Sequence, residues 1–292
     1  MKVLITGASG FLGQALVNFL SNNSLDIYPA YHNNKVDHPN AILCNFQEFV
    51  STKTLIDKIS PDTVVHCAAL TNVDLCQREK LECWNINVIA CMNICKSISK
   101  NTQFIHISTS QVFDGNLGNY HEDSVKNPIN WYGMTKSISE DIAMNFANSW
   151  TIIRLSNLYG FDPKGKNFFH FAVTKLLENE KVSAAGDTII SPTYKETVIS
   201  AINEVILNRM YGVYHIADLE TSTKYEVLLS LCKILGKEDL ISKEVASEIF
   251  TARRPYNTSL DITKFKKKFK NTKPLKLTEG LSEFVKKFKS II

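Results

Sequence analysis

The sequence lacks any apolar run that approaches the roughly 20 residues needed to span a bilayer. It also lacks a charged-then-apolar leader, because the strand-like segment Met1–Ile5 starts at once. These absences predict a cytoplasmic protein with no membrane partner.

Paired cysteine spacing is missing too. The chain has seven cysteines, an odd number, and no CxxC segment. Disulfide frameworks use even numbers, and structural zinc sites commonly use closely spaced pairs. Cys67 lies in an apolar strand-like run, and Cys91 and Cys95 lie one helical turn apart. We interpret them as small buried side chains in a reducing compartment, and the sequence predicts no metal site.

Neither charge sign dominates, with 33 Lys and Arg against 29 Asp and Glu and a net charge of +4. Two lysine clusters, Lys264–Lys270 and Lys286–Lys289, carry phenylalanines at helical spacing. They indicate solvated faces of amphipathic helices, whereas nucleic-acid binding needs a basic stripe across a domain. We therefore expect no nucleic-acid partner.

Apolar runs alternate with helical patterns through the first half of the chain. The expected strands are Lys2–Thr6, Asp26–Tyr31, Ala41–Cys44, Thr63–Cys67, Gln103–Ser108 and Thr151–Leu155. The expected helices are Phe11–Asn22, Glu48–Ile59, Asp74–Ser99 and Trp131–Ser149. Strand cores that are apolar at nearly every position are typical of strands buried on both faces. This order predicts an α/β fold of the Rossmann type, with a doubly wound parallel sheet.

The pattern loosens after about Tyr159, and no Gly/Ser-rich linker follows. Further helices are expected at Asn167–Asn179, Glu196–Asn208, Ser222–Leu235 and Thr278–Lys289, and a strand at Gly212–Ala217. We predict a dinucleotide-binding domain over residues 1–159. Residues 160–292 form a small C-terminal substrate-binding lobe packed on it, with some chain exchanged between the two.

A GxxGxxG segment, formed by Gly7, Gly10 and Gly13, follows the first strand and opens the first helix. Glycines allow a tight turn and close approach to a pyrophosphate, and a helix N-terminus offers free N–H groups. The strand–turn–helix context is the support that such a motif requires. The sequence therefore predicts a dinucleotide site.

The end of the second strand commonly selects the cofactor, because an acid there binds the ribose 2′-hydroxyl. The segment Tyr31–Lys35 holds no acid, and Lys35 is able to pair with a 2′-phosphate. We therefore expect NADPH, with NADH left open.

Tyr132 and Lys136 are four residues apart near the start of a predicted helix, so they project from one face. A nearby ammonium lowers a tyrosine pKa, and such a tyrosine is able to protonate an alkoxide. Thr109 follows a buried parallel strand, where ligands sit in open α/β sheets. Together these residues predict reduction of a carbonyl.

The glycine loop, Val65–Ala69, the strand end at Thr109 and the YxxxK helix together resemble an extended short-chain dehydrogenase/reductase. The stretches Val112–Gly115, Ser191–Thr193 and Arg254–Asn257 are similar to the dTDP-4-dehydrorhamnose reductase family, and the resemblance covers nearly the whole chain. It implies NAD(P)H-dependent reduction of the C4 ketone of a nucleotide-linked 6-deoxyhexulose, in deoxysugar or polysaccharide biosynthesis. A homodimer is compatible with the sequence.

The resemblance and the motifs assign catalysis to Thr109, Tyr132 and Lys136. The expected cofactor-binding residues are Gly7, Ser9, Gly10, Phe11, Leu12, Gly13, His32, Asn33, Lys35, Asn45, Phe46, Cys67, Ala68, Ala69 and Thr71, with Tyr132 and Lys136. The expected substrate-binding residues are Thr109, Ser110, Gln111, Val112, Asn167, Phe168 and Arg254.

Ser110 and Gln111 depart from the family pattern, which has Asp and Tyr next to the substrate. One alternative is an NADP-binding regulatory subunit like that of methionine adenosyltransferase, whose sequence the Thr223–Glu226 stretch also resembles. A nucleotide-sugar epimerase is a further alternative. A 4,6-dehydratase would want an acid pair after Thr109, and none is present.

Overall fold

The computed structural model describes the whole chain except residues 24, 163, 166 and 291–292. Its central feature is a seven-stranded, fully parallel sheet ordered β11-β6-β5-β4-β1-β2-β3. The strands are β1 (Lys2–Thr6), β2 (Asp26–Tyr31), β3 (Ile42–Leu43), β4 (Thr63–His66), β5 (Gln103–Thr109), β6 (Ser149–Leu155) and β11 (Gly212–Ile216). The strand order reverses between β1 and β4, and ligands of such sheets bind at that point.

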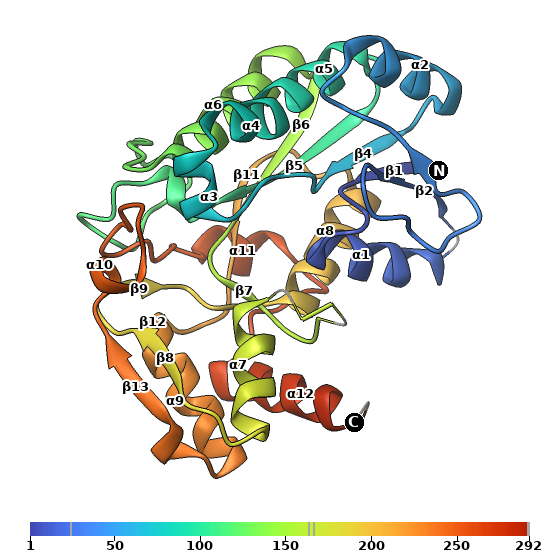
Figure 1. The fold of residues 1–292 in the computed structure, drawn as a ribbon. Helices are drawn as coiled ribbons and strands as arrows, with labels where there is room; N and C mark the ends of the chain where they lie inside the picture. Colours follow the sequence, from blue (N-terminus) through green and yellow to red (C-terminus); the bar gives the residue numbers. More distant parts are fainter. Residues whose placement is uncertain (24, 163, 166, 291–292) are drawn as a thin grey trace.

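Helices cover both faces of the sheet (Figure 1). Side chains alternate along β1, so Val3 and Ile5 join one core cluster while Leu4 joins the other. The first cluster lies under α1 (Phe11–Ser21), α8 (Lys195–Asn208) and α11 (Thr263–Lys268). The second lies under α2 (Phe49–Ile59), α5 (Ala90–Ser97) and α6 (Trp131–Phe146). The predicted doubly wound Rossmann-type fold is therefore confirmed.

The C-terminal part builds a smaller lobe, drawn below the sheet in Figure 1. Its core joins α7 (Phe168–Leu177), α9 (Lys224–Leu235), α12 (Leu277–Lys289) and the parallel pair β8 (Val182–Ala185) and β13 (Ile241–Glu244). This part also contains β7 (Leu158–Tyr159), β9 (Ile189–Ile190), β10 (Thr193–Tyr194), β12 (Ser222–Thr223), α10 (Ala246–Ile249) and a 3-10 turn at Glu238–Leu240. These short strands form two-stranded ladders, β7 with β10 and β9 with β12. Their few residues leave little periodicity to detect in the sequence.

Chain from the second half also completes the large sheet, since β11 pairs with β6 and α8 covers one sheet face. The division at residue 159 remains a proposal. None of the described helices is long and apolar enough to cross a membrane.

The long helical stretch predicted at Asp74–Ser99 is helical in the structure but is interrupted at Glu79. The segment is divided into α3 (Val73–Arg78), α4 (Lys80–Trp84), a π-helical turn at Asn85–Ile89 and α5. Glu79 leaves helical geometry, with φ −101° and ψ 61°. The buried Asn87 side chain in the π turn bonds both backbone groups of Leu70, at 2.8 and 3.1 Å. These two bonds stabilise the π turn inside the otherwise helical segment.

Candidate active site

A cavity of about 610 Å³ lies at the carboxyl ends of β1, β4, β5 and β6. Its walls come from both lobes, because Phe168, Lys224 and Arg254 face the glycine loop and the ends of the sheet strands. A second cavity, of about 260 Å³, shares Gly7, Gly10, Cys67 and Ala69 with the first.

The glycine loop has no room for a side chain at Gly7 or Gly13. Gly7 has φ +64°, and a Cβ there would lie 2.6 Å from the backbone nitrogen of Ala68. A Cβ on Gly13 would lie 2.2 Å from the Gly7 carbonyl oxygen. Gly10 begins α1 with no side-chain cap, which leaves the first N–H groups of the helix open at the cavity. This cradle fits a pyrophosphate.

The second cavity lies beyond β1, at the ends of β2 and β3. Besides the four residues shared with the first cavity, six more predicted cofactor residues line it: Ser9, His32, Asn33, Asn45, Phe46 and Ala68. No carboxylate is among the described residues that line it. Lys35 is exposed and lies outside this lining. The absence of an acid is compatible with binding of a 2′-phosphate. Lys35, which the sequence predicts to pair with that phosphate, does not line the cavity.

Tyr132 lies in the first turn of α6 and is 8% exposed, and Thr109 ends β5. Both line the large cavity. Burial raises the pKa of Tyr132 above its ordinary value, opposed by a hydrogen bond from the Thr109 hydroxyl. The expected net lowering of the Tyr132 pKa is therefore wrong for this structure, because burial outweighs the contacts that lower it. The phenol is therefore protonated at neutral pH, which is the form that a proton donor requires.

The Lys136 side chain is buried, and its ammonium donates to the Ile107 carbonyl oxygen at 2.7 Å. Its Nζ atom also lies 3.1 Å from Nε2 of His106. Burial lowers the pKa of Lys136 to about 8. The ammonium is therefore held by β5, the strand that carries Thr109.

A buried ion pair fixes α6 against the sheet. Arg154 on β6 donates two hydrogen bonds, each of 2.9 Å, to the two oxygens of Glu140. Ser108, the residue before Thr109, donates to the same carboxylate at 2.5 Å. Since Glu140 follows Lys136 by one helical turn, this network sets the position of the Tyr132 helix relative to β5. Sequence reasoning missed it because its three members lie on three elements.

Arg254 reaches the large cavity from the second lobe. Its guanidinium bonds Asp74, at 2.7 Å to Oδ2, and stacks over Phe250 at 4.2 Å. Burial raises the pKa of Asp74, but the Ala252 N–H and Arg254 outweigh it and hold the pKa below its ordinary value. Arg254 is therefore paired with Asp74 at the cavity. Its guanidinium still has N–H groups that are free to bind an anionic ligand.

Lys224 is a cavity residue that the sequence did not reveal as a candidate for the site. Its Nζ lies over the rings of Phe168 and Phe250, at 5.5 and 5.2 Å. Burial, with the neighbouring Arg254, lowers its pKa to about 8. Lys224 begins α9, and a lysine at the start of a helix is usually exposed. The local sequence therefore does not predict that it lines a cavity.

Some of the predicted substrate residues line the large cavity, and others do not. Gln111, Asn167 and Phe168 line the large cavity with Thr109 and Arg254. Ser110 and Val112 are buried at 1% and 0% exposure and lie outside its described lining. The Asn167 amide oxygen caps α7, accepting from the Phe169 N–H at 3.0 Å.

The remaining predicted cofactor residues, Phe11, Leu12, Cys67, Ala69 and Thr71, line the large cavity with Gly7, Gly10 and Gly13. Cys67 is half-buried there, whereas we expected it to be a buried core side chain.

The fold and the site together define a short-chain dehydrogenase/reductase of the extended type, with a dinucleotide cradle beside a Thr–Tyr–Lys constellation. More particularly, residues 1–290 match the model of the RmlD substrate binding domain family, and the chain belongs to that family.

Relatives within this family carry different names. The chain is 28% identical to methionine adenosyltransferase 2 subunit beta of Xenopus tropicalis, over 91% of this chain and 82% of that protein. It is 26% identical to dTDP-4-dehydrorhamnose reductase of Aggregatibacter actinomycetemcomitans, over 92% and 93% of the two chains. The crystal structure of dTDP-4-dehydrorhamnose reductase from Bacillus anthracis in complex with NADP matches with a TM-score of 0.88 and 28% identity. That match covers 98% and 99% of the two chains.

Proposed function

We propose that this protein is an NAD(P)H-dependent reductase of a nucleotide-linked 4-keto-6-deoxy sugar, of the dTDP-4-dehydrorhamnose reductase type. One observation carries the proposal: Thr109, Tyr132 and Lys136 share a cavity with the glycine cradle. A substrate in this cavity would therefore lie next to both the bound cofactor and a proton donor. A related reductase of the same fold has been solved with NADP, which supports the cofactor.

NADPH supplies hydride to the carbonyl carbon when it is bound. The Thr109 hydroxyl and the Tyr132 phenol hold the carbonyl oxygen, and Tyr132 passes its proton to that oxygen as charge develops. The Lys136 ammonium stabilises the phenolate left behind and binds the ribose next to the nicotinamide. Arg254, with its free donors, binds the diphosphate of the substrate.

The cavity at the ends of β2 and β3 supports NADPH over NADH, because none of the described residues that line it carries a carboxylate to repel a 2′-phosphate. All seven cysteines are free, which supports a reducing compartment such as the cytoplasm.

The test is the loss of NADPH absorbance with dTDP- and UDP-linked 4-keto-6-deoxyhexoses. Tyr132→Phe keeps the ring and removes the proton donor, so we expect at least about a hundredfold lower rate. Tyr211→Phe is the matched control, because Tyr211 is exposed at 47% and lies outside the cavity lining. Equal rates in wild type and Tyr132→Phe would refute the proposal.

A second candidate is a cofactor-binding regulatory subunit like the beta subunit of methionine adenosyltransferase 2. The 28% identity to that protein favours this candidate. So does Gln111 in the cavity lining, because it stands where the reductase family has Tyr. Under this alternative the protein binds NADPH with a measurable Kd but turns over none of the 4-keto sugars. It would also capture a partner protein in a pulldown.

A further inference from the structure

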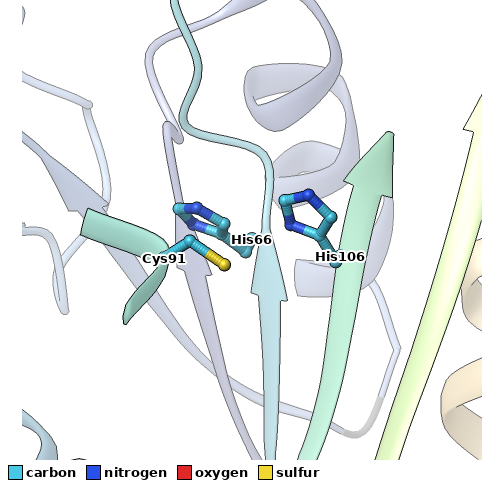
Figure 2. A group of neighbouring side chains, drawn as sticks. All are labelled: His66, Cys91 and His106. Carbon is cyan, nitrogen blue, oxygen red and sulfur yellow. The ribbon is translucent and has the colours of Figure 1, made fainter. Parts of the chain in front are cut away.

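Three side chains with metal-ligating atoms meet beneath the catalytic lysine, on the sheet face covered by α5 and α6. His66 on β4 and His106 on β5 are register partners, so their rings lie side by side. The ring centroids are 5.4 Å apart and the rings are inclined by 25°. Cys91, the second residue of α5, turns its sulfur toward the two rings (Figure 2).

The cluster is closed to solvent and compact. The exposed fractions of His66, His106 and Cys91 are 1%, 0% and 0%. The ligand atoms that the three side chains offer lie no more than 4.8 Å from one another. A tetrahedral zinc site has its ligand atoms roughly 3.3–3.8 Å apart, given metal–ligand bonds of about 2.0–2.3 Å, and the three side chains here would fill three of its four positions. The ligand atoms would have to move about 1 Å closer to one another to bind one ion, and small rotations of the three side chains are able to do this.

Each imidazole has one nitrogen engaged and the other free. Nδ1 of His66 hydrogen-bonds the Thr6 hydroxyl at 2.7 Å, and Nε2 of His106 lies 3.0 Å from the Ser139 hydroxyl. Nε2 of His66 and Nδ1 of His106 have no hydrogen-bond partner in the described part of the chain. Metal-binding histidines show this division, with one nitrogen on the ion and the other N–H held by a fixed acceptor.

The hydroxyl groups next to the two histidines are able to accept from one ring nitrogen of each, which would leave a lone pair on Nε2 of His66 and on Nδ1 of His106. The Ser139 hydroxyl donates to the Lys136 carbonyl at 2.9 Å, so it has lone pairs to accept from an N–H at Nε2 of His106, 3.0 Å away. The Lys136 ammonium also lies 3.1 Å from Nε2 and competes for that nitrogen as a donor. A metal ion on Nδ1 therefore selects the tautomer with the proton on Nε2 and leaves the ammonium bonded to the Ile107 carbonyl at 2.7 Å. The Thr6 hydroxyl accepts from the Ala68 N–H at 3.3 Å and has a second lone pair for Nδ1–H of His66. Burial lowers the pKa of His66 to about 3, with the Lys136 charge adding to the effect.

We propose that His66, His106 and Cys91 form a binding site for a borderline-soft divalent transition-metal ion, with Zn²⁺ as the representative. Two neutral imidazoles and a thiolate are the donor set that such ions prefer, and hard cations such as Mg²⁺ prefer oxygen. Binding deprotonates the Cys91 thiol and releases that proton to solvent. The ion ties α5 to the two central strands and fixes the His106 ring next to Lys136.

The site does not depend on the proposed reductase function, and it was invisible in the sequence because its ligands are 25 and 15 residues apart on three elements. Binding requires the metal during folding, since the cluster has no exposed atom to receive an ion afterwards. The experiment therefore measures metal in the full chain produced in zinc-supplemented medium, and in chain refolded with Co²⁺.

The expected result is one Zn²⁺ per chain by plasma mass spectrometry, and a thiolate-to-cobalt charge-transfer band after refolding with Co²⁺. Cys91→Ser should lose the band and most of the bound zinc. Cys95→Ser is the matched control, because Cys95 lies one turn further along α5, is equally buried and lies outside the cluster. It should keep both signals.

Wild-type chain that carries less than about a tenth of an equivalent of zinc and gives no cobalt band would overturn the proposal. Metal that persists unchanged in Cys91→Ser would also overturn it, since the ion would then lie elsewhere. If Cys91→Ser does not fold, His66→Gln provides the second variant and must lose the metal likewise.

Discussion

Lys136 and Ile107 are joined by a hydrogen bond of 2.7 Å from the ammonium to the carbonyl oxygen, two residues before Thr109 on β5. The lysine of the YxxxK pair is thus held by the strand that carries the threonine. Burial brings the pKa of this ammonium down to about 8, whereas burial raises that of the Tyr132 phenol.

The pH dependence of reduction follows from these two shifts. Lys136 is mostly charged below about pH 8 and mostly neutral above it, and the proposed mechanism needs the charge to stabilise the Tyr132 phenolate. We expect kcat/KM to be level below about pH 8 and to fall above it, with no earlier loss from Tyr132. Lys136→Met should be at least about a hundredfold slower and lack this fall. The same fall in Lys136→Met would assign it to another group.

The buried pair of Glu140 and Arg154 should dominate the local stability of α6. Glu140→Gln leaves the Arg154 charge buried without its partner, and we expect the free energy of unfolding to drop by about 3–5 kcal/mol. Urea unfolding measures the loss. The exposed pair of Lys53 and Asp57 provides the control, since Asp57→Asn should change stability by less than about 1 kcal/mol. An equal loss of stability in Glu140→Gln and Asp57→Asn would contradict the prediction that the buried pair contributes more than the exposed pair.

The glycine loop should respond to alanine in a graded way. A Cβ on Gly13 meets the Gly7 carbonyl oxygen at 2.2 Å, while one on Gly10 meets it at 3.2 Å. We expect Gly13→Ala to weaken NADPH binding by at least about tenfold, or about 1.4 kcal/mol, and Gly10→Ala to weaken it less. Fluorescence titration of NADPH compares the two, with circular dichroism to establish folding. Stronger damage from Gly10→Ala would contradict the proposed cradle.

Arg254 should act on substrate binding more than on chemistry. Arg254→Lys keeps the charge but loses the two-point geometry, so we expect KM for the nucleotide sugar to rise about tenfold with kcat nearly unchanged. Arg253→Lys is the neighbouring control, because the Arg253 side chain is exposed. A kcat effect without a KM effect would remove Arg254 from diphosphate binding.

Local patterns predicted the parts of the site that lie within one short segment. The Gly7–Gly13 loop, the Tyr132 and Lys136 spacing and the apolar strand cores depend on neighbours in sequence. The parts set by distant contacts were not predictable. Asn87 stabilises the π turn through its bonds to Leu70, and Lys224 reaches the cavity only through the docking of the second lobe.

The direct test of the central claim follows the hydride itself. NADPH carrying deuterium at nicotinamide C4, in the transferred position, is incubated with the protein and a nucleotide-linked 4-keto-6-deoxyhexose, and the sugar is analysed by mass spectrometry and NMR. The account predicts one deuterium at sugar C4, one NADP⁺ formed per sugar reduced, and loss of both in Tyr132→Phe. A sugar that is epimerised without net NADPH oxidation, or NADPH that binds while the sugar is unchanged, would contradict it.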